Sequence, residues 1–134
     1  MMNTKLLMSV SSLLMAICGV LLQFFPHEVL NYFNADSKGI LPLLVQMISA
    51  LYLGFAMMNW MAQTVLIGGI YARPLAMGNF LHFTVGAFAL LKYAYAAQNS
   101  WAIWVAAIVY SLLAVLFGIV LFTHPLKKMN AAEK

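Results

Sequence analysis

The sequence predicts an all-α integral membrane protein: four spans in an antiparallel bundle that forms one domain over residues 1–134. Four apolar stretches, at about residues 6–25, 40–62, 75–97 and 101–123, fill nearly the whole chain. Each reaches the roughly 20 apolar residues that a helix needs to cross a bilayer. Only 7% of the residues are charged and 65% are hydrophobic, whereas a soluble domain has about 25% charged and about half apolar residues.

The first span follows Lys5 and ends at Pro26, because proline cannot continue the hydrogen-bond ladder of a helix. Its apolar run is long for a signal sequence and lacks a small-residue cleavage site. Ile17 before Cys18 also fits lipoprotein cleavage poorly. We expect an uncleaved span, with a removed signal peptide as the alternative. Cys18 is the only cysteine, which excludes an internal disulfide and a multi-thiolate metal site.

The connection over residues 26–39 is the only sizeable segment on its side of the membrane. Val29, Leu30, Tyr32 and Phe33 have helical spacing. This spacing predicts either a short amphipathic helix on the membrane surface or a plug over the outer end of the bundle.

The later connections are shorter. Residues 64–73, with Gly68-Gly69 in the middle, predict an interfacial loop or a short helix on the cytoplasmic face. Arg73-Pro74 suits the start of the third span, because proline is favoured in the first helical turn. The brief connection over residues 98–100 makes the third and fourth spans an antiparallel hairpin.

Basic residues predict the orientation. Lys5, Arg73, Lys127 and Lys128 all fall on one side if both termini are cytoplasmic, as the positive-inside rule requires. Lys127 and Lys128 are expected to contact lipid headgroups, and the long stem of Lys92 allows it to reach them from the third span. The basic residues form no stripe with interleaved aromatics, so nucleic-acid binding is excluded.

Polar residues inside the spans are the candidates for a site, since they are costly in lipid and commonly face the bundle interior. They fall on two stripes of helical spacing, which also contain small and apolar residues. In the second span the stripe is Gln46, Ser49, Leu53, Ala56, Asn59 and Gln63; in the third it is Asn79, His82, Gly86, Ala89 and Tyr93.

Helix rise places Asn59, Asn79 and His82 at similar depth in the inner leaflet, near Ser11 and Ser12. One interpretation is a polar pocket with His82 as its titratable member. The other is structural: interhelical hydrogen bonds, worth about 0.6 kcal/mol each on average. We expect the structural role, because no carboxylate lies in any span.

Small residues predict close packing between helices. Ala50 and Gly54 lie one turn apart in the second span, as do Gly86 and Ala89 in the third. Either pair suits a contact inside the bundle or an interface between two copies.

The chain lacks the groupings that catalysis needs. His27, His82 and His124 are expected at three different depths, so they cannot share a metal. Asp and Glu residues are all outside the spans, which leaves no catalytic triad. We therefore expect no enzyme activity, no catalytic, cofactor-binding or metal site, and no cofactor.

A further pattern joins three segments. Residues 19–26 read GVLLQFFP, residues 50–56 read ALYLGFA, and Arg73-Pro74 opens the third span. This pattern resembles small bacterial four-helix integral membrane proteins classed as a domain of unknown function, over roughly residues 10–95. Those proteins are expected to have an arginine near the start of the second span, where this chain has Gln46. The resemblance implies the fold and a bacterial cytoplasmic (inner) membrane, and it implies no activity.

Two functions remain. The first is an accessory or scaffold subunit that binds membrane lipids and either a larger membrane complex or further copies of itself. The alternative is a small oligomeric transporter or channel with an inner-leaflet polar site around His82. Transport is disfavoured, since no span carries an Asp or Glu to couple protons or to bind cations.

Overall fold

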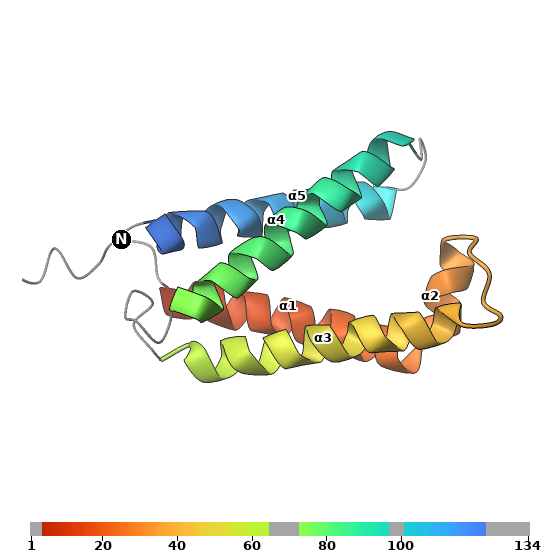
Figure 1. Ribbon diagram of the computed structural model, residues 1–134, viewed down its shortest axis with the longest axis horizontal. Coiled ribbons are helices and arrows are strands. Elements are labelled where there is room, and N and C mark those ends of the chain that lie inside the picture. The colour runs from red at the N-terminus through yellow and green to blue at the C-terminus, as the bar shows by residue number, and fades with distance from the viewer. Residues whose placement is uncertain (1–3, 65–72, 97–100, 123–134) are drawn as a thin grey trace, which may run out of the picture. The chain divides into compact units, whose positions relative to one another are not determined.

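The computed structural model describes residues 4–64, 73–96 and 101–122 (Figure 1). Over these ranges it is helical and has no strand. The helices are α1 (Thr4–Phe24), α2 (Pro26–Tyr32), α3 (Leu41–Ala62), α4 (Arg73–Ala96) and α5 (Trp101–Phe122). All but α2 are long and apolar enough to cross a bilayer. The predicted all-α, four-span fold is thus confirmed, and the chain is a multi-pass membrane protein; the side on which its termini lie stays a prediction.

The observed ends of the helices follow from local chemistry. Pro26 stands in the first turn of α2, two residues after α1 ends at Phe24. Pro42 and Pro74 likewise lie in the first turns of α3 and α4. Proline is tolerated there because its missing N–H would have no partner inside the helix. Each of the four spans lies within two residues of its predicted bounds at both ends.

The chain divides into two compact units, Met1–Thr64 and Val65–Lys134, and each is described by itself. The single domain over residues 1–134 stays a prediction. In the first unit, α1 and α3 pack as an antiparallel hairpin: Ser9, near the start of α1, bonds to Gln63, just after the end of α3. The helices approach closely at Gly19, where an added Cβ would lie 2.8 Å from the Leu53 side chain.

Helix α2 turns away from the end of α1 (Figure 1) and packs against its own hairpin on one side only. Pro26 and Leu30 are buried, whereas Tyr32 is 57% exposed. Asn34 ends the segment with a positive φ of 53°, a conformation that asparagine tolerates better than most residues. The predicted amphipathic segment does form a helix, with one packed and one open face.

The second unit is a hairpin of α4 and α5 built on aromatic rings. Phe83 stacks on Phe117 with ring centroids 5.6 Å apart, and the Tyr110 ring meets Phe83 edge-on at 5.2 Å. Gly86 makes room for this tyrosine, because a Cβ there would lie 2.7 Å from its ring. Offset and edge-to-face pairs of this kind are favourable beyond their buried area.

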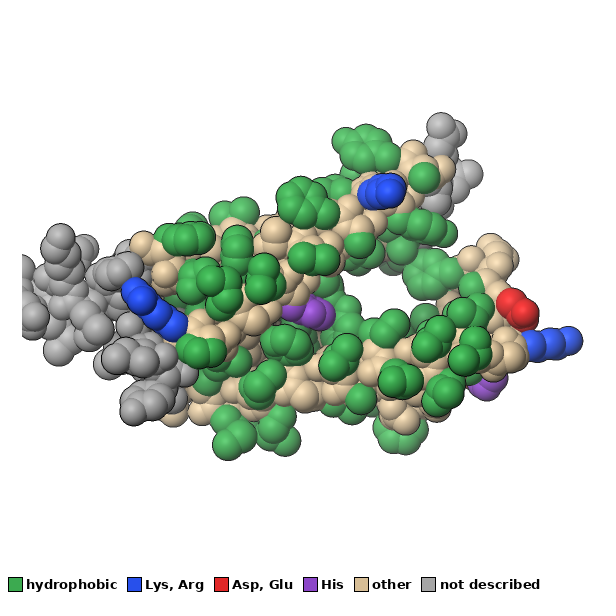
Figure 2. All heavy atoms as spheres, in the orientation of Figure 1, with side chains coloured by type: hydrophobic (Ala, Val, Ile, Leu, Met, Phe, Trp, Pro, Cys, Tyr) green, Lys and Arg blue, Asp and Glu red, His purple; other side chains and the backbone are tan. Residues whose placement is uncertain are grey.

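The surface of both units fits a bilayer. Figure 2 shows hydrophobic side chains along the helices and charged side chains toward helix ends. Large apolar side chains such as Leu51 (64% exposed) and Val85 (63% exposed) lie open in the middle of spans. Apolar surface this extensive is rare on soluble monomers, and lipid is its natural solvent.

Candidate functional site

The polar set predicted in the second span forms the face of α3 that packs against α1. Ser49 donates a hydrogen bond to the Gly19 carbonyl oxygen at 2.8 Å. From α1, Ser12 donates to the Ala56 carbonyl oxygen at 2.7 Å. Further bonds run from Asn59 to Ser11 (3.1 Å), from Ser9 to Gln63 (2.9 Å) and from Gln46 to the Gln23 carbonyl oxygen (3.4 Å).

These bonds have a direct physical reason. Lipid offers no hydrogen-bonding partner, so a hydroxyl or amide inside a span has to find one in the protein. Ser11, Ser49 and Asn59 are fully buried. The Asn59 amide donates to the Ser11 hydroxyl and lies 3.8 Å from the Met15 sulfur. Asn59 therefore holds α3 to α1, which favours the structural interpretation of this residue.

Asn79 and His82 lie on α4 in the second unit. Asn79 is fully buried, and its amide donates to the Leu75 carbonyl oxygen of its own helix at 3.0 Å. The His82 Nε2 atom is 3.5 Å from the Tyr110 hydroxyl of α5. The His82 ring also packs edge-on against Phe83, with centroids 5.2 Å apart. A long hydrogen bond and an aromatic neighbourhood orient this imidazole within the hairpin.

The polar set predicted in the third span is only partly the packing face of α4. Gly86 faces Tyr110 of α5, but Ala89 and Tyr93 are exposed. Ala87 and Ala94 are buried instead, because the Phe83–Phe117 stack sets the rotation of α4 against α5.

The predicted cluster of Asn59, Asn79 and His82 draws on both units. Asn59 is held by α1 of the first unit, and the other two belong to the second. Their convergence stays a prediction. The acidic residues within the described ranges, Glu28 and Asp36, lie in α2 and the loop after it, so no described residue of α4 or α5 gives His82 a carboxylate.

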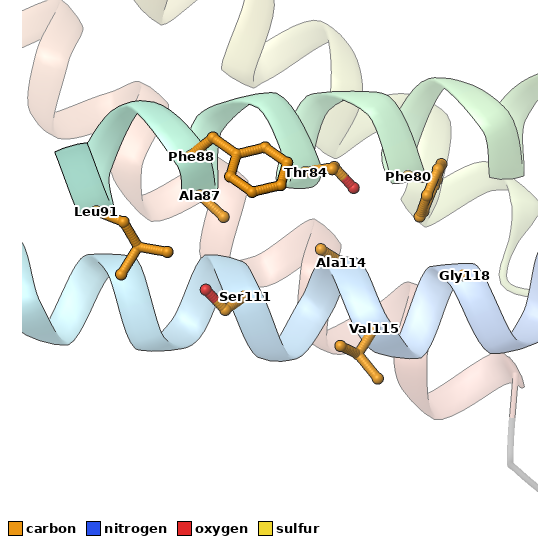
Figure 3. A pocket seen from close by; sticks show the side chains of 9 residues that line it. All are labelled: Phe80, Thr84, Ala87, Phe88, Leu91, Ser111, Ala114, Val115 and Gly118. Atoms are coloured by element: carbon orange, nitrogen blue, oxygen red, sulfur yellow. The ribbon is translucent and has the colours of Figure 1, made fainter.

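A groove of about 280 Å³ runs between α4 and α5 (Figure 3). Phe88 and Leu91 lie toward one end of it, and Phe80 and Gly118 toward the other. The lining residues are Phe80, Thr84, Ala87, Phe88, Leu91, Ser111, Ala114, Val115 and Gly118. Ligand pockets usually measure about 300–1,000 Å³, so this groove suits a single side chain or a short length of acyl chain.

Two hydroxyls line this groove. Ser111 donates to the Ala107 carbonyl oxygen of its own helix at 2.7 Å. The Thr84 Oγ1 atom is buried and has no hydrogen-bond partner within the described ranges. Neither hydroxyl has a base beside it among the lining residues, so the groove contains no activated nucleophile.

The predicted headgroup contacts fall in two groups. Lys92 is exposed on the last turns of α4, where its stem can extend toward the end of the span. Lys127 and Lys128 lie outside the described residues. So do residues 65–72, which make up nearly all of the predicted interfacial segment. Within the ranges that are described, no three His, Cys, Asp or Glu side chains gather to hold a metal ion.

Tyr110 and Ser111 of α5 were not among the residues predicted from the sequence. Both are polar residues near the middle of the most apolar span, and that position alone is a signal, because intramembrane polar groups need a partner. Tyr110 supplies the ring that fills the space beside Gly86 and the hydroxyl that faces His82.

No family model, curated protein or solved structure matches this chain.

Proposed function

We propose that the protein is a non-catalytic accessory or scaffold subunit of the bacterial cytoplasmic membrane, and that it binds a larger membrane complex or lipid through its apolar faces. The bacterial membrane follows from the sequence resemblance, and the orientation with both termini inside follows from the basic residues. The proposal of association rests on one face of α3.

This face is the methionine stripe, defined as Met47, Ala50, Gly54, Met57 and Met61. These residues share helical spacing and all are exposed; Met47 and Met57 are each 61% and Met61 is 72% exposed. A Cβ at Gly54 would meet nothing within 4 Å. The stripe is offset by about one residue from the polar face that packs on α1. One residue corresponds to a rotation of about 100° around the helix axis.

The composition of the stripe suits a partner helix. Methionine side chains are flexible and polarisable, so they adapt to irregular surfaces and are common at promiscuous binding sites. Between them, Ala50 and Gly54 leave a shallow place where another backbone can approach closely. A face that met only lipid would need neither feature.

Site-specific photocrosslinking in native membranes tests this proposal. A benzophenone amino acid in place of Met57 should give a discrete protein adduct. The same probe in place of Ile108, which is 63% exposed on α5, should give only lipid adducts. Gly54→Leu should abolish the Met57 adduct without unfolding the protein, because the added side chain enters open space. A chain that gives no protein adduct from either position and purifies alone would contradict the binding of a membrane complex.

The alternative is a small oligomeric transporter or channel with a site around His82. The observation that favours it is the approach of the His82 ring to the Tyr110 hydroxyl inside the α4–α5 hairpin. Against it stands the absence of Asp and Glu from all of the spans. A flux assay in liposomes separates the two functions.

A further inference from the structure

A second groove lies in the corner between α1 and α2. It measures about 400 Å³, and it belongs wholly to the first unit. Its lining residues are Leu21, Phe25, Glu28, Val29, Tyr32 and Phe33. Leu21 is 48%, Phe25 48% and Tyr32 57% exposed, so the groove is open and its apolar walls are accessible. Glu28 supplies its only charge.

The level of this groove in the bilayer follows from the length of α1. That helix has 21 residues, which span about 30 Å, the thickness of the hydrocarbon core. Phe25 follows its last residue, and α2 turns away there (Figure 1). The groove therefore lies where acyl chains meet headgroups, in the outer leaflet under the predicted topology.

The walls of the groove are chemically complementary to an amphiphile, because one part is apolar and another carries a charge. Leu21, Phe25 and Val29 offer apolar surface to an acyl chain, and the Glu28 carboxylate attracts a positive charge.

The neighbouring His27 and Asp36 side chains make contacts of their own. His27 Nδ1 lies 3.1 Å from the Ser37 carbonyl oxygen. The Asp36 carboxylate accepts from the Lys38 backbone N–H at 2.9 Å. These contacts keep the residues 36–38 in a turn of their own, and none of these residues lines the groove.

We infer that this groove binds a phospholipid with an ethanolamine headgroup, its chain against Leu21, Phe25 and Val29 and its primary ammonium on Glu28. The inference deepens the lipid-binding part of the proposed function and rests on it. The headgroup choice follows from charge: a primary ammonium donates hydrogen bonds to a carboxylate, the quaternary ammonium of choline cannot, and the net negative charge of phosphatidylglycerol is repelled by Glu28.

Native mass spectrometry of the purified full chain tests the inference. The protein is released from detergent that contains equimolar palmitoyl-oleoyl phosphatidylethanolamine, phosphatidylcholine and phosphatidylglycerol. The wild type should retain phosphatidylethanolamine over each of the others by about two- to fivefold, the range for one partly exposed ion pair. Glu28→Gln should bring that ratio close to one, because it removes the charge and keeps the shape.

Asp36→Asn is the matched control. It removes the same charge from the same segment, keeps an oxygen for the Lys38 N–H, and leaves the groove untouched, so the preference should persist. Equal retention of the three lipids, a preference for phosphatidylglycerol, or an undiminished ratio in Glu28→Gln would each overturn the inference. So would a lipid-free dimer, which would make a second copy the occupant.

Failure of this inference can be told apart from failure of the proposed function. The lipid ratio is measured on the purified chain and depends on Glu28 in α2. The crosslinking experiment is done in native membranes and depends on the methionine stripe of α3.

Discussion

Replacing Gly19 by alanine should weaken the α1–α3 hairpin, although alanine is the better helix former. The new Cβ would lie 2.8 Å from both Cγ and Cδ2 of Leu53 and 3.2 Å from the Leu53 backbone nitrogen. A change of side-chain rotamer could move the terminal methyl, but the backbone nitrogen moves only with the helix. The two helices must therefore separate by a few tenths of an ångström at this point.

The size of the effect follows from three contributions. Overpacking of a well-packed contact costs about 1–3 kcal/mol. Separation also lengthens the bond from Ser49 to the Gly19 carbonyl oxygen, now 2.8 Å, and an interhelical bond of this kind is worth about 0.6 kcal/mol. The higher helix propensity of alanine offsets up to about 1 kcal/mol. We expect a net loss of about 1–2 kcal/mol, which changes the folded-to-unfolded ratio by a factor of about 5–30.

Unfolding by sodium dodecyl sulfate in mixed dodecylmaltoside micelles, followed by circular dichroism, measures this loss. Gly54→Ala is the matched control, since it makes the same change in a span where the added Cβ meets nothing within 4 Å. It should be neutral or slightly stabilising. If Gly19→Ala unfolds at the wild-type midpoint, or if both variants lose the same stability, the close approach at Gly19 does not hold the hairpin together.

Three further predictions concern topology and the polar residues of α4. In a Cys18→Ala background, cysteines at positions 3 and 130 should resist a membrane-impermeant thiol reagent added to intact cells, and one at position 36 should be labelled; labelling at both termini would refute the orientation. His82→Gln should lower stability by at most about 1–2 kcal/mol in the detergent assay and leave the cellular phenotype intact; a folded variant without function would favour a pocket. Liposomes that contain the purified protein should show no proton or ion flux above empty vesicles under an imposed gradient, and a flux that disappears in His82→Ala would make the protein a transporter.

The bounds of the spans could be predicted closely because the ability of a segment to cross a bilayer depends directly on its composition. Any apolar run of about 20 residues with few charges is long enough to span the hydrocarbon core, whichever helices pack beside it. The packing face of α3 was also foreseeable. Its polar residues recur with helical spacing, and in lipid such residues have few places to go except against another helix. The α1–α3 hydrogen bonds from Ser12, Ser49 and Asn59 follow that rule.

The rotation of α4 was harder to foresee, because size rather than polarity decides it. In this helix the aromatic Phe83 is buried while the predicted Tyr93 is exposed, and both are large rings in an apolar span. What selects Phe83 is the complementary ring of Phe117 and the space beside Gly86 that Tyr110 occupies. Such complementarity is a property of pairs of residues on two helices. The hydropathy pattern along one helix therefore cannot reveal it.

Under the proposed function, the two faces of α3 would separate stability from association. Its polar face bonds to α1 through side chains that could not remain unpaired in lipid. The methionine stripe begins one residue later along the same helix and carries no group that needs a partner. Substitutions on the first face are therefore expected to act on folding, and under the proposal those on the second face would act on association. Because the two faces are about 100° apart, a partner helix can bind the stripe without disturbing a single bond of the hairpin.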